Sequence, residues 1–113
     1  MIFNVRSVKA FIYREPVDLR KGHDGLSSIV IHEITENLLS GAIFLFVNKR
    51  KNACKAIVFD GTGLVLIHKK LEQGTFMSFA SLEEVEEVTA SELALIFEGS
   101  RITLPLSPKE FKL

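Results

Sequence analysis

Three aspartates are the side chains best placed for metal-dependent nuclease chemistry. That reaction needs clustered carboxylates that hold divalent ions about 4 Å apart. Asp18, Asp24 and Asp60 are the candidates, because each stands near the end of an expected element. Asp60 is also explained as a turn residue before Gly61, and Asp18 or Asp24 as a helix cap. We therefore predict a protein without catalytic residues, with a metal-dependent nuclease built on these aspartates as the alternative.

Other patterns that bind metals or cofactors are missing from the sequence. His23, His32 and His68 lie far apart and lack the His-Glu-x-x-His spacing of helical zinc sites. Cys54 is the single cysteine, so the chain can form neither an internal disulfide nor a Cys-x-x-Cys zinc half-site. The segment 61–63, Gly-Thr-Gly, lacks the third glycine of a dinucleotide fingerprint and sits between two expected strands. We expect no metal and no cofactor.

A first basic segment stands at the start of an expected helix. Arg20 and Lys21 oppose the helix dipole there, which is mildly unfavourable unless an anion is bound. Gly22 and Gly25 share one helical face and would let a backbone or a phosphate come close. The simpler interpretation, which we favour for the glycines, is tight packing of the helix on a sheet. In that interpretation Arg20 pairs with a nearby carboxylate.

A second basic segment, 48–52, precedes Lys55, and a third, 68–70, ends an expected strand. If these strands pair as neighbours, Lys49 to Lys51 lie on the same face as Lys69 and Lys70. Such a patch would neutralise phosphates, since no base-reading element is evident. Basic residues at a hairpin tip also serve simply to keep a loop soluble. The predicted DNA-contacting residues are Arg20, Lys21, Lys49, Arg50, Lys51, Lys55, Lys69 and Lys70.

The charges are distributed unevenly along the 113 residues, although the net charge is zero. Residues 1–70 contain 11 Lys and Arg against 6 Asp and Glu, whereas residues 71–113 contain 3 against 8. This separation favours an anionic partner for one part and a cationic one for the other. No apolar run approaches the roughly 20 residues of a membrane span. We expect a cytoplasmic protein of ordinary globular composition.

The elements that must position these residues follow from periodicity. Residues 3–14 predict one strand or a short hairpin, and apolar spacing from about Asp18 to Ile34 predicts a helix. Gly61 and its neighbours supply a hairpin turn within a β-meander. The expected strands of this meander are Ile43 to Val47, Lys55 to Phe59, Leu64 to His68, and Thr75 to Phe79.

A second helix carries the clearest local signals. Thr89 and Glu92 have the spacing of a capping box, and Gly99 stands where a left-handed residue ends a helix. The apolar stripe expected to face the sheet is Leu93, Ile96 and Phe97. The sequence therefore predicts a single α+β domain over residues 1–113, in which a mostly antiparallel β-meander sheet packs with two helices.

Three ordered blocks resemble the second-open-reading-frame accessory protein of insertion-sequence-66 transposons. Residues 17–26 resemble its "TDMRKGFDGL" block, and residues 44–76 resemble a strand, an "NRRRD"-like loop, "WDGDG" and "KRLEEGRF". Residues 88–99 resemble "LTPEQLALLLEG". The residues that match the motifs are Asp18, Arg20, Lys21, Gly22, Asp24, Gly25, Asp60, Gly61, Gly63 and Gly74.

The resemblance implies a non-enzymatic role in transposition beside a separate transposase, which is the suspected partner. This accessory protein is unrelated to the RNA-guided nuclease that shares the name TnpB. The sequence departs from the pattern at His23, Asn52, Phe59 and Thr75, and its tail lacks a basic ending. Two mechanisms remain open. The protein contacts element DNA or the transposition complex through the basic residues, or it is an interaction module that holds the transposase through exposed apolar surface or the acidic segment 83–87.

Overall fold

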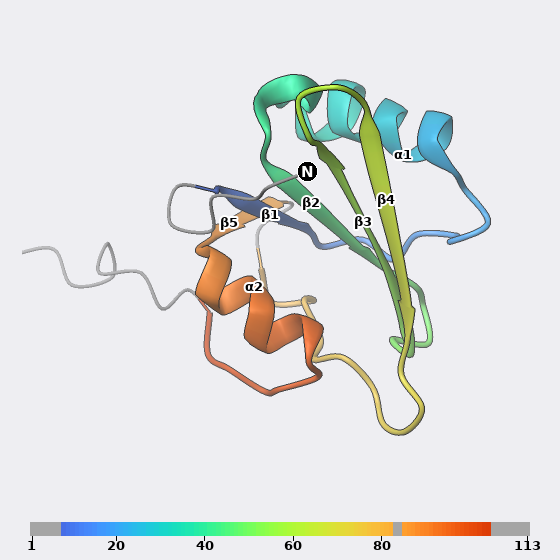
Figure 1. Cartoon of the computed structure of the whole chain (residues 1–113). Helices are drawn as coiled ribbons and strands as arrows, with labels where there is room; N and C mark the ends of the chain where they lie inside the picture. The colour runs from blue at the N-terminus through green and yellow to red at the C-terminus, as the bar shows by residue number, and fades with distance from the viewer. Residues whose placement is uncertain (1–7, 83–84, 105–113) are drawn as a thin grey trace, which may run out of the picture.

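The computed structural model describes residues 8–82 and 85–104, which form a five-stranded sheet with a helical layer on each face (Figure 1). The strand order is β4-β3-β2-β1-β5. β1 runs parallel to β2, and the other neighbouring strands are antiparallel. The strands are β1 (Ala10–Tyr13), β2 (Ile43–Val47), β3 (Ala53–Phe59), β4 (Leu64–Lys70) and β5 (Val85–Val88). The predicted α+β fold is confirmed.

The first helical layer connects β1 to β2, as a parallel pair requires. α1 (His23–Ile29) continues into the π-helical turn η1 (Val30–Ile34), and the short 3₁₀ turn η2 (Leu38–Ser40) follows. Thr35 adopts a left-handed conformation, with φ of 57°, and ends the helical run. The buried apolar core on this face contains Leu26, Ile29, Val30, Ile34, Phe44, Phe46 and Ile57.

The second layer covers the opposite face and contains α2 (Ala90–Phe97). The predicted capping box is present, because Thr89 Oγ1 accepts from Glu92 N at 3.1 Å and Glu92 Oε1 accepts from Thr89 N at 2.7 Å. Gly99 follows with φ of 92°, as predicted. The two hydrogen bonds satisfy the backbone N–H groups of Thr89 and Glu92, so they fix the residue at which this helix begins.

The predicted apolar stripe of α2 does face the sheet. Leu93 and Ile96 are buried, and Phe97 is partly buried against the same core. Beside them lie β-strand residues such as Leu45 and the buried Cys54. Because apolar layers cover both faces of the sheet, its central strands are apolar along most of their length. None of the helices in residues 8–82 and 85–104 has the length and apolarity needed to cross a membrane.

The predicted strand Thr75 to Phe79 is wrong. This segment is irregular, and it buries Phe76 and Phe79 in the core below α2. Phe76 N donates to Lys51 O at 2.7 Å, so the segment is tied to the β2–β3 turn instead of a strand. The fifth strand is β5, which pairs with β1 and includes residues 85–87 of the acidic segment. The pairing of β5 with β1 joins residues more than 70 positions apart, so local sequence does not reveal it.

The start of the first helix also differs from the prediction. α1 begins at His23, not near Asp18, and Gly22 is its N-cap without any side-chain hydrogen bond. Asp24 lies in the first turn, where the helix dipole favours a negative charge, but it is not the cap. Asp18 forms a turn with Arg20 and so is unavailable as a cap. The predicted first strand is observed only as β1, and its residues 3–7 lie outside the described residues.

Candidate nucleic-acid interface

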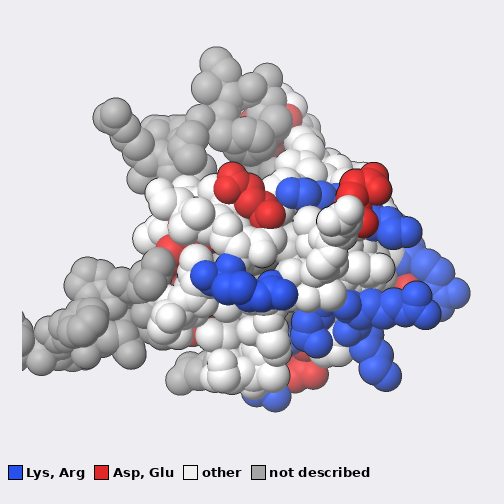
Figure 2. All heavy atoms as spheres, turned by 90° about the horizontal axis from the view of Figure 1, so that it is seen from below, with Lys and Arg blue, Asp and Glu red and all other residues white. Residues whose placement is uncertain are grey.

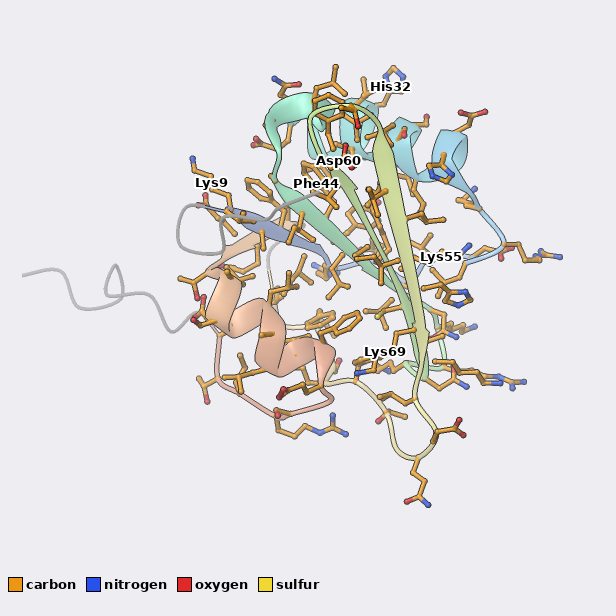
Figure 3. The ribbon with its side chains drawn as sticks, viewed as in Figure 1. Lys9, His32, Phe44, Lys55, Asp60 and Lys69 are labelled. Atoms are coloured by element: carbon orange, nitrogen blue, oxygen red, sulfur yellow. The ribbon has the colours of Figure 1, made fainter. Side chains whose placement is uncertain are left out.

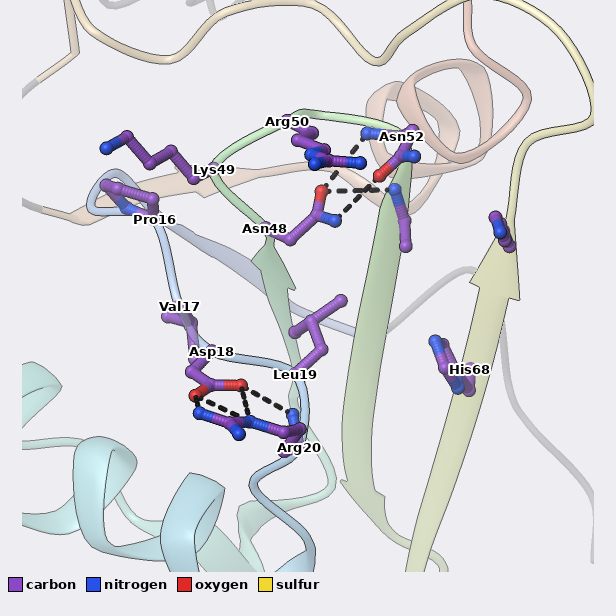
Figure 4. A pocket seen from close by; sticks show the side chains of 12 residues that line it. Pro16, Val17, Asp18, Leu19, Arg20, Asn48, Lys49, Arg50, Asn52 and His68 are labelled. Carbon is purple, nitrogen blue, oxygen red and sulfur yellow. Dashed lines mark hydrogen bonds and ion pairs between the residues drawn. The ribbon is translucent and has the colours of Figure 1, made fainter.

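An open groove with a volume of about 680 Å³ lies at the end of the sheet where β2 turns into β3 (Figure 4). Residues 16–20 border it on one side, the β2–β3 turn closes one end, and the start of β3 and the end of β4 with His68 lie on the other side. Four of its lining residues are Lys or Arg, and one is acidic. We call it the basic groove; its lining is Pro16, Val17, Asp18, Leu19, Arg20, Asn48, Lys49, Arg50, Asn52, Ala53, His68 and Lys70.

Two asparagines fix the turn that carries the groove's exposed cations. Asn48 Oδ1 accepts from the backbone N–H groups of Asn52 and Ala53 at 3.1 and 3.2 Å. Asn48 Nδ2 donates to Asn52 Oδ1 at 2.7 Å. These bonds satisfy the turn internally, so Lys49 and Arg50 project from a fixed tip into solvent. Their positive charges are therefore presented at one defined edge of the groove.

The opposite wall contains an ion pair. Val17 N donates to Val47 O at 3.0 Å, which fastens this wall to the end of β2. Arg20 donates to Asp18 through Nε at 3.0 and 3.1 Å and through Nη2 at 2.6 Å. The hydrogen bonds from Arg20 lower the pKa of Asp18 to about 2. The prediction that Arg20 pairs with a nearby carboxylate is confirmed, and its charge is balanced locally.

β4 sends its adjacent lysines to opposite faces of the sheet, as strand alternation requires. Lys70 and His68 line the basic groove. Lys69 lies on the α2 face, where Nζ donates to Phe97 O at 2.6 Å and stands 4.5 Å from the centre of the Phe97 ring (Figure 3). Lys69 thus neutralises the C-terminal end of α2. The expectation that Lys69 and Lys70 share one face with the turn is wrong.

The remaining predicted cations flank the groove without lining it. Lys55 lies opposite His68 in the β3–β4 register, and its Nζ donates to Lys21 O at 3.0 Å. Lys51 has a left-handed φ of 61° and lines a separate hollow of about 240 Å³ with Arg14. Seen from below, Lys and Arg side chains gather over one side of this end of the molecule (Figure 2). The groove and its flanks form one strongly cationic surface.

The aspartates proposed for metal chemistry do not converge. Asp60 follows the far end of β3 (Figure 3), so it lies roughly 20 Å along the strand from Ala53, which lines the groove together with Asp18. Its Oδ1 accepts from Thr62 N, Thr62 Oγ1 and Gly63 N at 2.9 to 3.0 Å, and these bonds lower the pKa of Asp60. Within residues 8–82 and 85–104 no three His, Cys, Asp or Glu side chains are grouped to hold a metal ion. The nuclease alternative therefore lacks its carboxylate cluster in this part of the chain.

The glycines of the first basic segment do not serve tight packing on the sheet, contrary to our interpretation. A Cβ at Gly22 would meet nothing within 4 Å. A Cβ at Gly25 would come within 3.0 to 3.3 Å of the Lys21 side chain, which is flexible. Among the motif glycines, Gly61 has a left-handed φ of 104° and lies in the β3–β4 turn after Asp60.

The sequence placed Asn48, Asn52 and His68 in the basic segments, but they were not predicted to be site residues. Asn48 and Asn52 hold the turn, and His68 contributes a ring to the floor. The strand period of two would have assigned His68 and Lys70 to one face. No local signal places the wall around Val17 beside them, because that contact joins residues 30 positions apart, Val17 and Val47.

The fold and the groove define a small α+β protein with a cluster of exposed cations around one end of its sheet. A family profile described as "IS66 Orf2 like protein" matches residues 8–106, and the chain belongs to this family. It is thus a transposition-associated accessory protein of an insertion sequence. It is also similar to a Sinorhizobium fredii protein named "Uncharacterized protein y4jC", with 30% identity over 99 residues that cover 88% of this chain and 85% of the relative. No solved structure matches the fold closely enough to be compared.

Proposed function

We propose that this protein binds the DNA of its insertion sequence through phosphates held in the basic groove, as an accessory component beside the transposase. The observation that supports this proposal is the set of Lys49, Arg50 and Lys70 around one groove in which Asp18 is the only acid among the lining residues. Arg20 adds guanidinium N–H groups that its pair with Asp18 does not use.

Binding of this kind reads the backbone, not the bases. The groove is lined by turns and strand ends, and residues of α1 and α2 are not part of its lining. Recognition of base edges usually needs a helix or a two-stranded ribbon in the major groove. We therefore expect affinity that depends steeply on salt and little on sequence.

The test is the salt dependence of DNA binding by a triple variant, Lys49→Ala/Arg50→Ala/Lys70→Ala. Each lost phosphate contact lowers the slope of log K against log salt by about 0.9, so the triple variant should lose about 2.7. A control removes two exposed cations that line neither the groove nor the hollow beside it, Lys9 and Arg101, and so measures the effect of charge elsewhere on the surface. It should keep most of the wild-type slope, and both variants should keep the wild-type circular dichroism.

The second candidate is an interaction module for the transposase without DNA contact. Ile31 and Leu39 on the first helical layer are 49% and 56% exposed, so they are apolar side chains that a partner could contact. Of the acidic segment 83–87, residues 83 and 84 lie outside the described residues, and Glu86 and Glu87 pair with β1 in the sheet. No DNA binding at low salt, with or without the transposase, would favour this module and reject the groove.

A further inference from the structure

A second hollow adjoins the basic groove where the β2–β3 turn meets residues 14–16. It has a volume of about 240 Å³, and we call it the side hollow. Pro16, Asn48 and Lys49 line both the groove and the side hollow, so the two share a border. Figure 4 shows Pro16 and Lys49 on the side of the groove away from His68. A chain molecule that lies in the groove can therefore continue past Lys49 into the side hollow.

Cations stand at the rim of the side hollow. Arg14, Lys49 and Lys51 supply three positive charges to its lining, against one negative charge from Glu15, which pairs with Arg14 at 3.6 Å. Arg14 Nη1 also donates to Leu82 O at 3.4 Å, which leaves further N–H groups of its guanidinium for a phosphate. The positive charge of the basic groove thus continues along the side hollow.

The floor of the side hollow is apolar. Val47 and Phe79 are each 5% exposed and so lie at its bottom, while Pro16 is exposed and Met77 is half-buried in its lining. A phosphate gains nothing from such contacts. An unpaired base is stabilised when it stacks against apolar side chains. The combination of a cationic rim with an apolar floor therefore fits a nucleotide whose base is unpaired.

Hydrogen bonds between distant segments fix the walls of the side hollow. The bond from Val17 N to Val47 O holds residues 14–16 close to the end of β2. The bond from Phe76 N to Lys51 O, 2.7 Å long, holds the segment 77–80 against the β2–β3 turn. A site that is already formed loses less conformational entropy when it binds.

The size of the side hollow excludes a duplex. It is smaller than the roughly 300 Å³ at which pockets begin to enclose a small organic ligand, so it admits a base but not a double helix. Duplex DNA keeps its bases inside the stack and resists bending over about 150 base pairs. A duplex can contact the cations of the groove, but only an unpaired base reaches the floor of the side hollow.

We propose that the basic groove and the side hollow together bind single-stranded DNA, with phosphates along the cations and one unpaired base on the apolar floor. This inference rests on the proposed function, because it names the form of DNA that the same site binds best. The charge of both hollows and their shared border select this occupant. A surface that binds through phosphates alone favours the duplex, which has the higher charge density. The side hollow should reverse that preference.

The first test compares a labelled single strand without self-complementary segments and the blunt duplex of the same sequence, by fluorescence anisotropy in one buffer. We expect the wild type to bind the single strand about fivefold more tightly or better, which is the lower end of what one stacked base contributes. Equal or tighter binding of the duplex overturns this inference and leaves the proposed function standing. Binding of neither form rejects both.

The second test places a carboxylate in the side hollow. Ser78 Oγ accepts from Ala80 N at 3.3 Å, and the aspartate of Ser78→Asp can accept the same bond, so the local turn should persist. The variant should lose about fivefold or more of its affinity for the single strand and much less for the duplex. Ser40→Asp is the matched control, because Ser40 Oγ accepts from Ala42 N at 3.1 Å and Ser40 lines neither hollow. It should change neither affinity.

The third test removes one cation of the side hollow. Glycine adopts the left-handed φ of 61° at Lys51 without strain, so Lys51→Gly should keep the turn. It should lower the salt slope for the single strand by about 0.7 and leave the duplex slope near the wild-type value. Lys9→Ala, at an exposed cation outside both hollows, should change neither slope. Equal losses on both forms of DNA in Ser78→Asp or Lys51→Gly would contradict a base in the side hollow.

Discussion

Replacing Asp18 with asparagine should strengthen DNA binding by releasing Arg20. In the wild type the Asp18 carboxylate accepts three side-chain hydrogen bonds from Arg20, the shortest at 2.6 Å. Phosphate must compete with this carboxylate for the same guanidinium. Asparagine removes the negative charge and leaves one carbonyl oxygen as acceptor, so Arg20 becomes available as a full cation.

The expected size follows from the charges of the groove. Arg20, Lys49, Arg50 and Lys70 against Asp18 give four positive charges minus one, which is +3, and Asp18→Asn makes this +4. One further phosphate contact adds about 0.9 to the salt slope, so affinity should fall about 3.5-fold more than in the wild type between 50 and 200 mM salt. At low salt Asp18→Asn should bind more tightly than the wild type.

Fluorescence anisotropy with a labelled duplex over a series of salt concentrations measures both quantities. Asp24→Asn is the matched control, because Asp24 is an exposed aspartate in the first turn of α1 that does not line the groove. It removes the same charge and should leave the slope near the wild-type value. Equal slopes for Asp18→Asn and Asp24→Asn would refute the argument that the ion pair controls Arg20.

Two further predictions concern the fold. Thr89→Ala removes one half of the capping box and should lower the free energy of unfolding by about 1 kcal/mol, measured by urea denaturation. Thr103→Ala, the same change at an exposed threonine after α2, is the comparison, and an equal loss in both would contradict the cap's role. Burial raises the pKa of the Cys54 thiol to about 11, so native protein should react slowly with a thiol reagent at pH 8 and fast only after unfolding. Because this folded-state pKa is raised, stability should decline as pH rises from about 9 toward 11; fast reaction of the native protein at pH 8 would show that Cys54 is accessible.

Elements whose signals are local could be predicted from the sequence. The capping box of Thr89 and Glu92 joins residues three apart, and the turn at Asp60 and Gly61 uses hydrogen bonds within four residues. The β2–β3–β4 meander needs only short connections, so its strands could be predicted from alternation and turn residues. The pairing of Arg20 with a carboxylate two residues away belongs to the same group.

Features that depend on contacts between residues far apart in the sequence could not be predicted. The segment 75–79 has the composition of a strand, but burial of Phe76 under α2 holds it as an irregular chain, and β5 takes the place beside β1. The first helix begins late because residues 16–20 are bound to the end of β2 and to each other.

The candidate site shows the same division. Local alternation separates Lys69 from Lys70, but the sequence does not tell which face of β4 carries the groove. The bond between Val17 and Val47 brings a wall from before α1 against the end of the sheet, and α2 captures Lys69 on the other face. The cations of the groove could be listed from the sequence, because charge is a property of each residue. Which of them lie together could not be predicted, because it depends on which face of the sheet each helical layer covers.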